Sequence, residues 1–156
     1  MSPQSLLKRF YAAFATLDAR TMQSCYAPDA RFQDPVFALQ GREEIGTMWM
    51  MLCETIRNRG QAVFRLEARD IEAMEDRGSA HWEARYRFGT AGRMVHNVVE
   101  ARFTFEDGLI ATHEDDFDFW RRDATTRECT IEAIAHVRRQ IRGRDDRAVE
   151  RHVELH

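Results

Sequence analysis

Residues 26–37 read Tyr-Ala-Pro-Asp-Ala-Arg-Phe-Gln-Asp-Pro-Val-Phe, a short stretch that ends with an acid placed directly before a proline. Pro35 disfavours helical backbone at Asp34 and favours an extended conformation there. Because side chains alternate along a strand, Phe32 and Asp34 are expected to share one face. A carboxylate on a buried face needs a partner or a function. The alternative is that Asp34 faces water and caps the turn before Val36.

The composition predicts one globular domain. The chain has 156 residues and a net charge of -3, which gives no general attraction to nucleic acid or to an anionic membrane. No apolar run approaches the length of a membrane span, so no membrane association is expected. Cys25, Cys53 and Cys129 lack the spacing of metal ligands. They predict free thiols in a reducing cytoplasm.

Helical periodicity dominates the first part of the chain. Apolar residues recur at helical spacing from Ser5 to Leu17, and Asp18 is placed to cap a short second helix over 19–25. A third helix is expected to begin after Gly41, where two acids favour the helix dipole, and to end near Ile56.

Beyond residue 60 the pattern alternates, as it does in half-buried strands. Asp107-Gly108 is a strong hairpin signal, and a slip in the alternation at Asp70-Ile71 indicates a bulge. The predicted strands cover 63–74, 79–88, 95–105 and 109–120. Helices followed by a meander of strands predict an α+β fold in which the helices cover one face of the sheet.

Residues 121–156 differ in character from the 1–120 domain. Thr125 and Glu128 form a capping box before apolar residues at helical spacing, which predicts a helix over 126–142 that packs on the body or on a partner. After Gly143 the segment is charged and is expected to be frayed. Acids interleave with its basic residues, so a solvated helix face is favoured over a nucleic-acid contact.

The order of motifs over Ser5 to Trp120 resembles the nuclear transport factor 2-like superfamily, with its SnoaL-like and ketosteroid isomerase-like members. The matching motifs are Phe10 to Phe14, residues 26–32, Asp34-Pro35, Gly41 to Ile45 with Trp49, and Phe105 to Ile110 followed by His113. The resemblance implies a cystatin-like fold, a curved antiparallel sheet forming a cone closed by the N-terminal helices. The cone binds small apolar molecules in many members and has lost catalysis in others, so the fold alone does not settle the function.

The resemblance to ketosteroid isomerase makes Asp34 the candidate general base, because that enzyme uses an aspartate in an Asp-Pro-Val context. A buried aspartate in an apolar cone would be a competent base near neutrality. Counting along the chain places the two oxyanion-hole positions at Phe10 and Ala101, and Tyr11 is expected to point elsewhere. Because losing one such donor costs ~10²–10³ in rate, ketosteroid isomerase activity itself is not expected.

His113 and Asp115 lie two residues apart on one face of the last predicted strand and can meet sideways. With Asp34 they form the predicted catalytic set, an acid–base pair facing across a pocket. The alternative is a satisfied internal hydrogen-bond network. The residues predicted to contact a substrate are Phe10, Phe14, Trp49, Trp82, Tyr86, Asn97, Ala101 and Phe117. No cofactor is expected, and His113, Asp115, Asp116 and His96 do not have the spacing of a metal site.

These observations predict a small-molecule-binding SnoaL-like protein, acting as a proton-transfer enzyme of the isomerase, cyclase or dehydratase type on an apolar carbonyl compound. The alternative is a non-catalytic ligand-binding or dimerisation module of the same fold. A homodimer is expected through the outer face of the sheet, where the contact surface is of mixed polar and apolar character and not mainly hydrophobic. Its residues are His81, Glu83, Arg85, Arg87 and Arg102.

Overall fold

The computed structural model describes residues 1–35, 37–88, 93–117 and 139. The elements in these ranges are α1 (Pro3–Ala15), α2 (Ala19–Ser24), β1 (Tyr26–Gln33), β2 (Ala38–Gln40), α3 (Arg42–Gly60), the 3-10 helix η1 (Gln61–Val63), β3 (Arg65–Ala73), β4 (Arg77–Phe88), β5 (Arg93–Glu106) and β6 (Leu109–Asp116). The end of the predicted last strand at 118–120, the predicted helix over 126–142 apart from Arg139, and the charged tail lie outside the described residues, as does Cys129.

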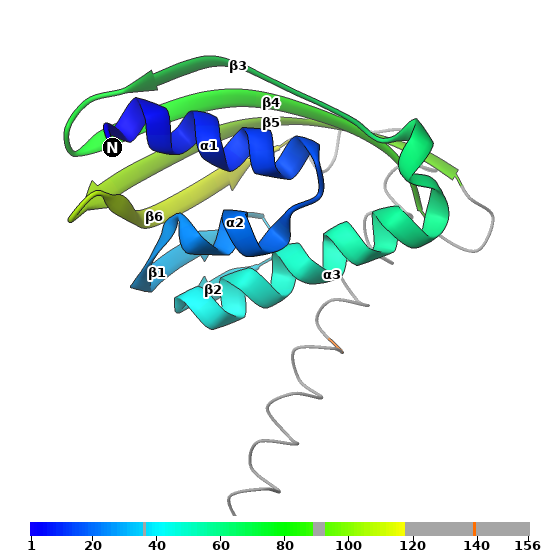
Figure 1. The fold of residues 1–156 in the computed structure, drawn as a ribbon, viewed down its shortest axis with the longest axis horizontal. Coiled ribbons are helices and arrows are strands. Elements are labelled where there is room, and N and C mark those ends of the chain that lie inside the picture. The colour runs from blue at the N-terminus through cyan, green and yellow to red at the C-terminus, as the bar shows by residue number, and fades with distance from the viewer. Residues whose placement is uncertain (36, 89–92, 118–138, 140–156) are drawn as a thin grey trace, which may run out of the picture.

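The six strands form one sheet in the order β2-β1-β6-β5-β4-β3. Neighbouring strands are antiparallel except β1 and β6, which pair in parallel. Figure 1 shows the helices on one face of this curved sheet, with β3, β4 and β5 arching over α1. α2 and α3 pack against each other and against β1, and α3 also reaches β4. The predicted α+β fold with helices on one face is therefore confirmed.

Local sequence signals explain where the elements begin and end. The Ser2 hydroxyl accepts a hydrogen bond from the Ser5 amide at 3.2 Å, which caps α1 two residues earlier than predicted. Asp18 caps α2 by accepting from the Thr21 amide, as predicted. Asp107 and Gly108 both have positive φ, 52° and 76°, which is the geometry of a two-residue hairpin turn. Both turn and cap signals act over a few residues, so the sequence could predict them.

The predicted bulge in β3 is also confirmed. The pairing of β3 with β4 shifts between Arg69 and Glu72, and Asp70 between them has a φ of 52°. An extra residue in one strand increases the local twist of the sheet. The bulge therefore contributes to the curvature that lets the sheet wrap around α1.

The core lies between the sheet and the helices and is rich in aromatic side chains. Phe10, Phe14 and Tyr26 are each 0% exposed, and Trp49 is 3% exposed. Among the described residues, the buried polar or charged side chains are Thr47, His113 and Asp115. A histidine and an acid inside an apolar core require hydrogen-bond partners. Their surroundings are therefore the place to look for a functional site.

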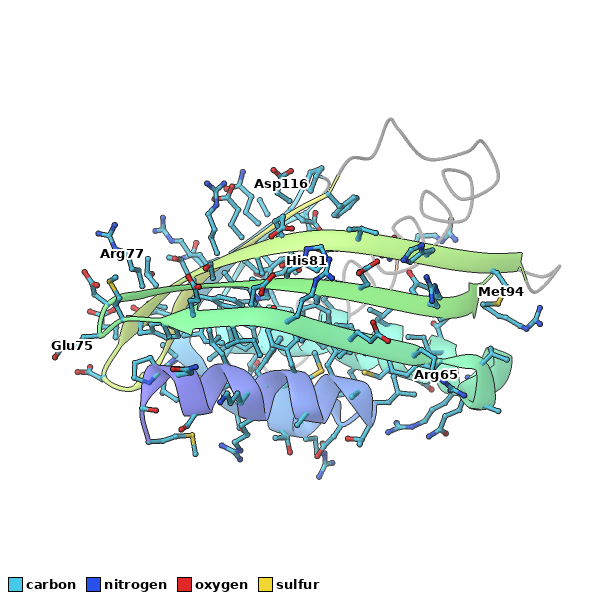
Figure 2. The ribbon with its side chains drawn as sticks, turned by 90° about the horizontal axis from the view of Figure 1, so that it is seen from above. Arg65, Glu75, Arg77, His81, Met94 and Asp116 are labelled. Carbon is cyan, nitrogen blue, oxygen red and sulfur yellow. The ribbon has the colours of Figure 1, made fainter. Side chains whose placement is uncertain are left out.

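The opposite face of the sheet is polar. His81 on β4 contacts Glu100 on β5 through Nδ1, and its Nε2 lies 3.3 Å from Glu83 Oε2. His96 Nε2 lies 3.0 Å from Glu83 Oε1. Figure 2 shows His81 near the middle of the sheet, between labelled residues at the two ends, Arg65 and Met94 at one and Glu75 and Arg77 at the other. In the described part of the chain, no helix combines the length and apolarity needed to cross a membrane.

Candidate functional site

His113 on β6 is the centre of the buried polar group. Its side chain is 0% exposed, and both ring nitrogens have partners inside the protein. Nδ1 lies 2.7 Å from the hydroxyl of Tyr26 on β1, and Nε2 lies 2.8 Å from Oδ1 of Asp115. The predicted sideways contact between His113 and Asp115 is confirmed.

Two tryptophans extend this contact in both directions. Trp49 Nε1, on α3, donates to the Tyr26 hydroxyl at 3.0 Å, and Trp82 Nε1, on β4, donates to Asp115 Oδ1 at 3.4 Å. We call the set Trp49, Tyr26, His113, Asp115 and Trp82 the polar string. One helix and three strands supply it, so it forms only when the sheet and α3 have come together.

Aromatic rings enclose the imidazole of His113. Ring centroids lie 5.7 Å away for Phe10, 5.0 Å for Phe32 and 4.4 Å for Phe103. The rings of Tyr26 and Trp49 lie roughly parallel to the imidazole, with interplanar angles of 17° and 21°. This packing keeps water away from the imidazole and fixes its plane.

Tyr11 on α1 lies beside the polar string. It is 3% exposed, and in the described part of the chain its hydroxyl is the one buried side-chain nitrogen or oxygen without a hydrogen-bond partner. Burial raises the pKa of Tyr11 well above its usual value, and the negative charge of Asp115 raises it further. The expectation that Tyr11 points away from the interior is wrong. The curved sheet covers a stripe of α1 wide enough to bury both Phe10 and Tyr11.

Phe10 and Ala101, the two positions where the sequence lacks oxyanion-hole donors, thus have polar neighbours. Tyr11 follows Phe10 on the buried side of α1. Ala101 on β5 pairs directly with Asp115 on β6, so the Asp115 side chain lies next to the small Ala101 on the inner face. The Tyr11 hydroxyl and the Asp115 carboxyl are therefore present in this region of the interior. They come from positions 11 and 115, not from positions 10 and 101 at which the resemblance places the oxyanion donors.

Asp34 is half-buried, so the expectation that it is fully buried is wrong. Its Oδ1 accepts a hydrogen bond from the Phe37 amide at 2.5 Å, and its own amide donates to the Phe37 carbonyl at 3.0 Å. β1 ends at Gln33, because Pro35 cannot continue the hydrogen-bond ladder. Asp34 therefore caps the turn, as the alternative interpretation of the sequence stated.

Asp34 also does not stand opposite His113 across a pocket. Phe32, two residues earlier, pairs in register with His113 across the parallel β1–β6 contact. Asp34 therefore follows a strand that lies directly beside β6. Asp34 and His113 therefore come from neighbouring segments of the sheet, not from opposite sides of the cone.

The remaining predicted contact residues line the inner face of the fold. Phe14, Trp82, Tyr86 and Ala101 are buried, whereas Asn97 and Phe117 are half-buried. Asn97 Nδ2 donates to the Tyr86 hydroxyl at 2.9 Å. Among the described residues, no cluster of His, Cys, Asp and Glu side chains has the arrangement of a metal site.

Sequence reasoning missed Tyr26 as a member of the site. Counting in steps of two from Phe32 reaches Tyr26, but the pairing of β1 with β6 shifts between Tyr26 and Arg31 and Pro28 is exposed, so alternation alone does not place Tyr26 in the site. What no local pattern contained was its partner, which lies 87 residues further along the chain.

Comparison with known proteins assigns the chain to a family. A search of curated proteins finds no match. Solved structures that match include a Mycobacterium tuberculosis protein of unknown function, with 17% identity, a TM-score of 0.62, and coverage of 88% of this chain and 87% of that one. TsrD from Streptomyces laurentii has 24% identity and a TM-score of 0.60, with coverage of 74% and 87%. An LEH-like epoxide hydrolase of M. tuberculosis has 16% identity and a TM-score of 0.60, with coverage of 84% and 93%.

At these identities the solved structures establish the fold alone, which is that of NTF2-like and cystatin-like proteins. The family model for the SnoaL-like domain matches residues 7–113, a range that holds α1 to β6 as far as His113. The chain therefore belongs to the SnoaL-like domain family, within the NTF2-like superfamily.

Proposed function

We propose that the protein binds a small apolar compound carrying a carbonyl group inside the cone and moves a proton on it. The SnoaL-like fold supports a small-molecule-binding domain. The finer proposal rests on the chemistry of Tyr11, Asp115 and Asp34. It places the chain among proton-transfer enzymes of the isomerase, cyclase or dehydratase type.

The observation that carries the proposal is the buried hydroxyl of Tyr11, which has no hydrogen-bond partner in the described part of the chain. A buried polar group left unpaired costs about 1–3 kcal/mol. A ligand oxygen bound next to Tyr11 would remove that cost. The ring centroid of Phe103 lies 6.4 Å from that of Tyr11 and 4.4 Å from that of His113, the partner of Asp115, so Tyr11 and Asp115 belong to one region of the interior that a single ligand would meet.

The reaction needs no external reagent. A carboxylate takes the proton from the carbon beside the carbonyl, and the electron pair of the broken C–H bond moves toward the carbonyl oxygen. The Tyr11 hydroxyl donates a hydrogen bond to that oxygen as its negative charge develops. Return of the proton at another carbon completes an isomerisation. Asp34 is the acceptor favoured by its sequence context, and Asp115 is the acceptor within the polar string.

A second candidate function is ligand binding without catalysis. It is supported by the satisfied state of His113, whose two nitrogens are both bonded within the protein. Such a network stabilises a core without any chemistry. The two candidates differ in whether a bound carbonyl compound exchanges protons.

Deuterium exchange separates the two functions. β-Tetralone in deuterated water, followed by proton NMR, reports proton transfer beside the carbonyl. The wild type should accelerate exchange above the buffer rate, and Tyr11→Phe should lower the acceleration by ~10²–10³. Asp34→Asn and Asp115→Asn, which retain the shape of each side chain, should identify the carboxylate that accepts the proton.

Glu114→Gln is the matched control, because Glu114 is exposed and pairs with Arg102 on the outer face. It should leave the exchange rate unchanged. Exchange at the buffer rate, together with a thermal shift on adding β-tetralone, would favour the binding function. If neither β-tetralone nor cyclic β-dicarbonyl compounds show accelerated exchange or a thermal shift, both candidate functions are contradicted.

A further inference from the structure

The geometry points to Tyr26 as a positioning residue that holds His113 in the neutral tautomer with its proton on Nε2, so that Asp115 is the member of the polar string that meets a ligand. The statement about the ligand rests on the proposed function. The statement about the tautomer follows from the hydrogen bonds alone, and it can be tested without any ligand.

Trp49 fixes the direction of the first hydrogen bond in the polar string. An indole N–H can only donate, so the Tyr26 hydroxyl is the acceptor of the 3.0 Å bond from Trp49 Nε1. The proton of the Tyr26 hydroxyl then needs an acceptor of its own. In the described part of the chain, the other polar partner of this hydroxyl is Nδ1 of His113 at 2.7 Å. Nδ1 is therefore the unprotonated nitrogen of the ring.

The other end of the polar string agrees with this direction. With Nδ1 unprotonated, neutral His113 carries its proton on Nε2 and donates it to Asp115 Oδ1 at 2.8 Å. The indole of Trp82 also donates to Oδ1. Oδ1 of Asp115 therefore acts only as an acceptor in the polar string. Every proton along the polar string then has an acceptor.

The opposite tautomer leaves a proton unpaired. If Nδ1 carried the proton, it would face the oxygen of Tyr26, which already accepts from Trp49. The Tyr26 hydroxyl proton would then have no acceptor among the described residues, in a site that is 0% exposed. A buried unpaired donor is costly, and this cost is what fixes the tautomer.

The tautomer decides which group contacts a ligand. His113 has no nitrogen left over, because Tyr26 and Asp115 occupy both. Asp115 keeps acceptor capacity, because its contacts with described residues fall on Oδ1 and leave Oδ2 available. Tyr11 supplies the donor. The site therefore fits a neutral compound with a hydroxyl or enol proton beside a carbonyl, such as an α-hydroxyketone.

NMR of the histidine ring nitrogens in the full-length protein tests the tautomer. The wild type at about pH 7 should show His113 with a protonated Nε2 and an unprotonated, hydrogen-bonded Nδ1. His113→Gln identifies the signals. Tyr26→Phe should shift the Nδ1 signal downfield because its donor is lost, whereas Tyr11→Phe should not move it. A proton on Nδ1 in the wild type, on its own or together with one on Nε2, would overturn the inference even if Tyr26→Phe fails to fold.

Two probes test the role of Asp115. α-Tetralone offers only an acceptor, and its α-hydroxylated derivative adds a donor next to it. The wild type should bind the hydroxylated compound about 10-fold tighter or more, because a hydrogen bond to a charged group is strong. Asp115→Asn should remove that preference. Equal affinity of the wild type for both compounds would show that Asp115 does not meet the ligand. Binding of neither would contradict the proposed function, while the nitrogen spectrum would still decide the tautomer.

Discussion

The Tyr26 hydroxyl lies 2.7 Å from Nδ1 of His113, and the two residues stand on β1 and β6, which pair in parallel. This contact joins β1, the first strand along the chain, to β6, the last described strand. Because Trp49 donates to the Tyr26 hydroxyl, this contact decides which nitrogen of His113 carries the proton. The consequences can be measured in stability as well as in chemistry.

Two matched tyrosine variants should differ in stability. Tyr26→Phe leaves His113 Nδ1 and Trp49 Nε1 unpaired in the core, and each unpaired group costs about 1–3 kcal/mol. Tyr11→Phe removes a hydroxyl that has no partner in the described part of the chain, so it should be neutral or stabilising. Urea denaturation of the two variants, with unchanged m-values, measures the difference. Equal losses would mean that the Tyr26 hydroxyl does not bond His113 in solution.

Gly46 on α3 should resist substitution because of its close contact with α2. A Cβ at this position would lie 2.2 Å from Nε2 of Gln23, whose side chain also donates to the Arg42 carbonyl at 3.3 Å. Gly46→Ala alone should therefore destabilise the protein by about 1–3 kcal/mol. In a Gln23→Ala background the same change should instead stabilise it, by up to about 1 kcal/mol, through the helix propensity of alanine.

The double-mutant cycle of Gly46→Ala and Gln23→Ala gives the coupling directly. Chemical denaturation of the four proteins is sufficient. Additive effects would show that the two side chains do not compete for the same space.

The stability of the outer face should depend on pH through His81. The pKa of His81 is raised, chiefly by its hydrogen bond with Glu100 and also by the one with Glu83. Burial and the positive charge of Arg69 lower this pKa but do not reverse the shift. A raised pKa in the folded state means that the stabilisation is fully present below the unfolded value of about 6.5 and is lost as pH rises through the folded value.

Glu100→Gln should therefore cost more stability near pH 6 than near pH 9, by no more than about 1 kcal/mol for such an exposed pair. Melting temperatures of the two proteins at both pH values measure this. A cost that is the same at both, or larger near pH 9, would contradict a charged His81 in the folded protein.

The outer face should also carry self-association. We expect a homodimer there, because Met94 and Val98 on β5 are 46% and 43% exposed within an otherwise polar sheet face. Val98→Arg should convert the dimer to a monomer by burying an unpaired charge in the contact. Met74→Arg is the matched control, because Met74 is 71% exposed near the β3–β4 turn. Light scattering at micromolar concentration should detect the difference, and a monomeric wild type would exclude this interface.

The sequence by itself determined the elements and the family. Asp107-Gly108 specified a hairpin, alternating residues specified β4 and β5, and the slip at Asp70 specified a bulge. These signals are local, because turn chemistry and side-chain alternation depend on residues that are neighbours in the chain. Together they led to the α+β fold and to the SnoaL-like resemblance that the family model confirms.

The tertiary structure alone decided which polar groups meet. Asp34 and His113 were both predicted to be catalytic, yet Pro35 ends β1 and lets Asp34 cap a turn, while His113 receives Tyr26 from 87 residues away. The curvature of the sheet also determined that Tyr11 is buried against Phe103, which in turn lies against His113. Contacts of this kind depend on the register of distant strands and on how far a sheet wraps around a helix, and no short pattern in the sequence encodes either.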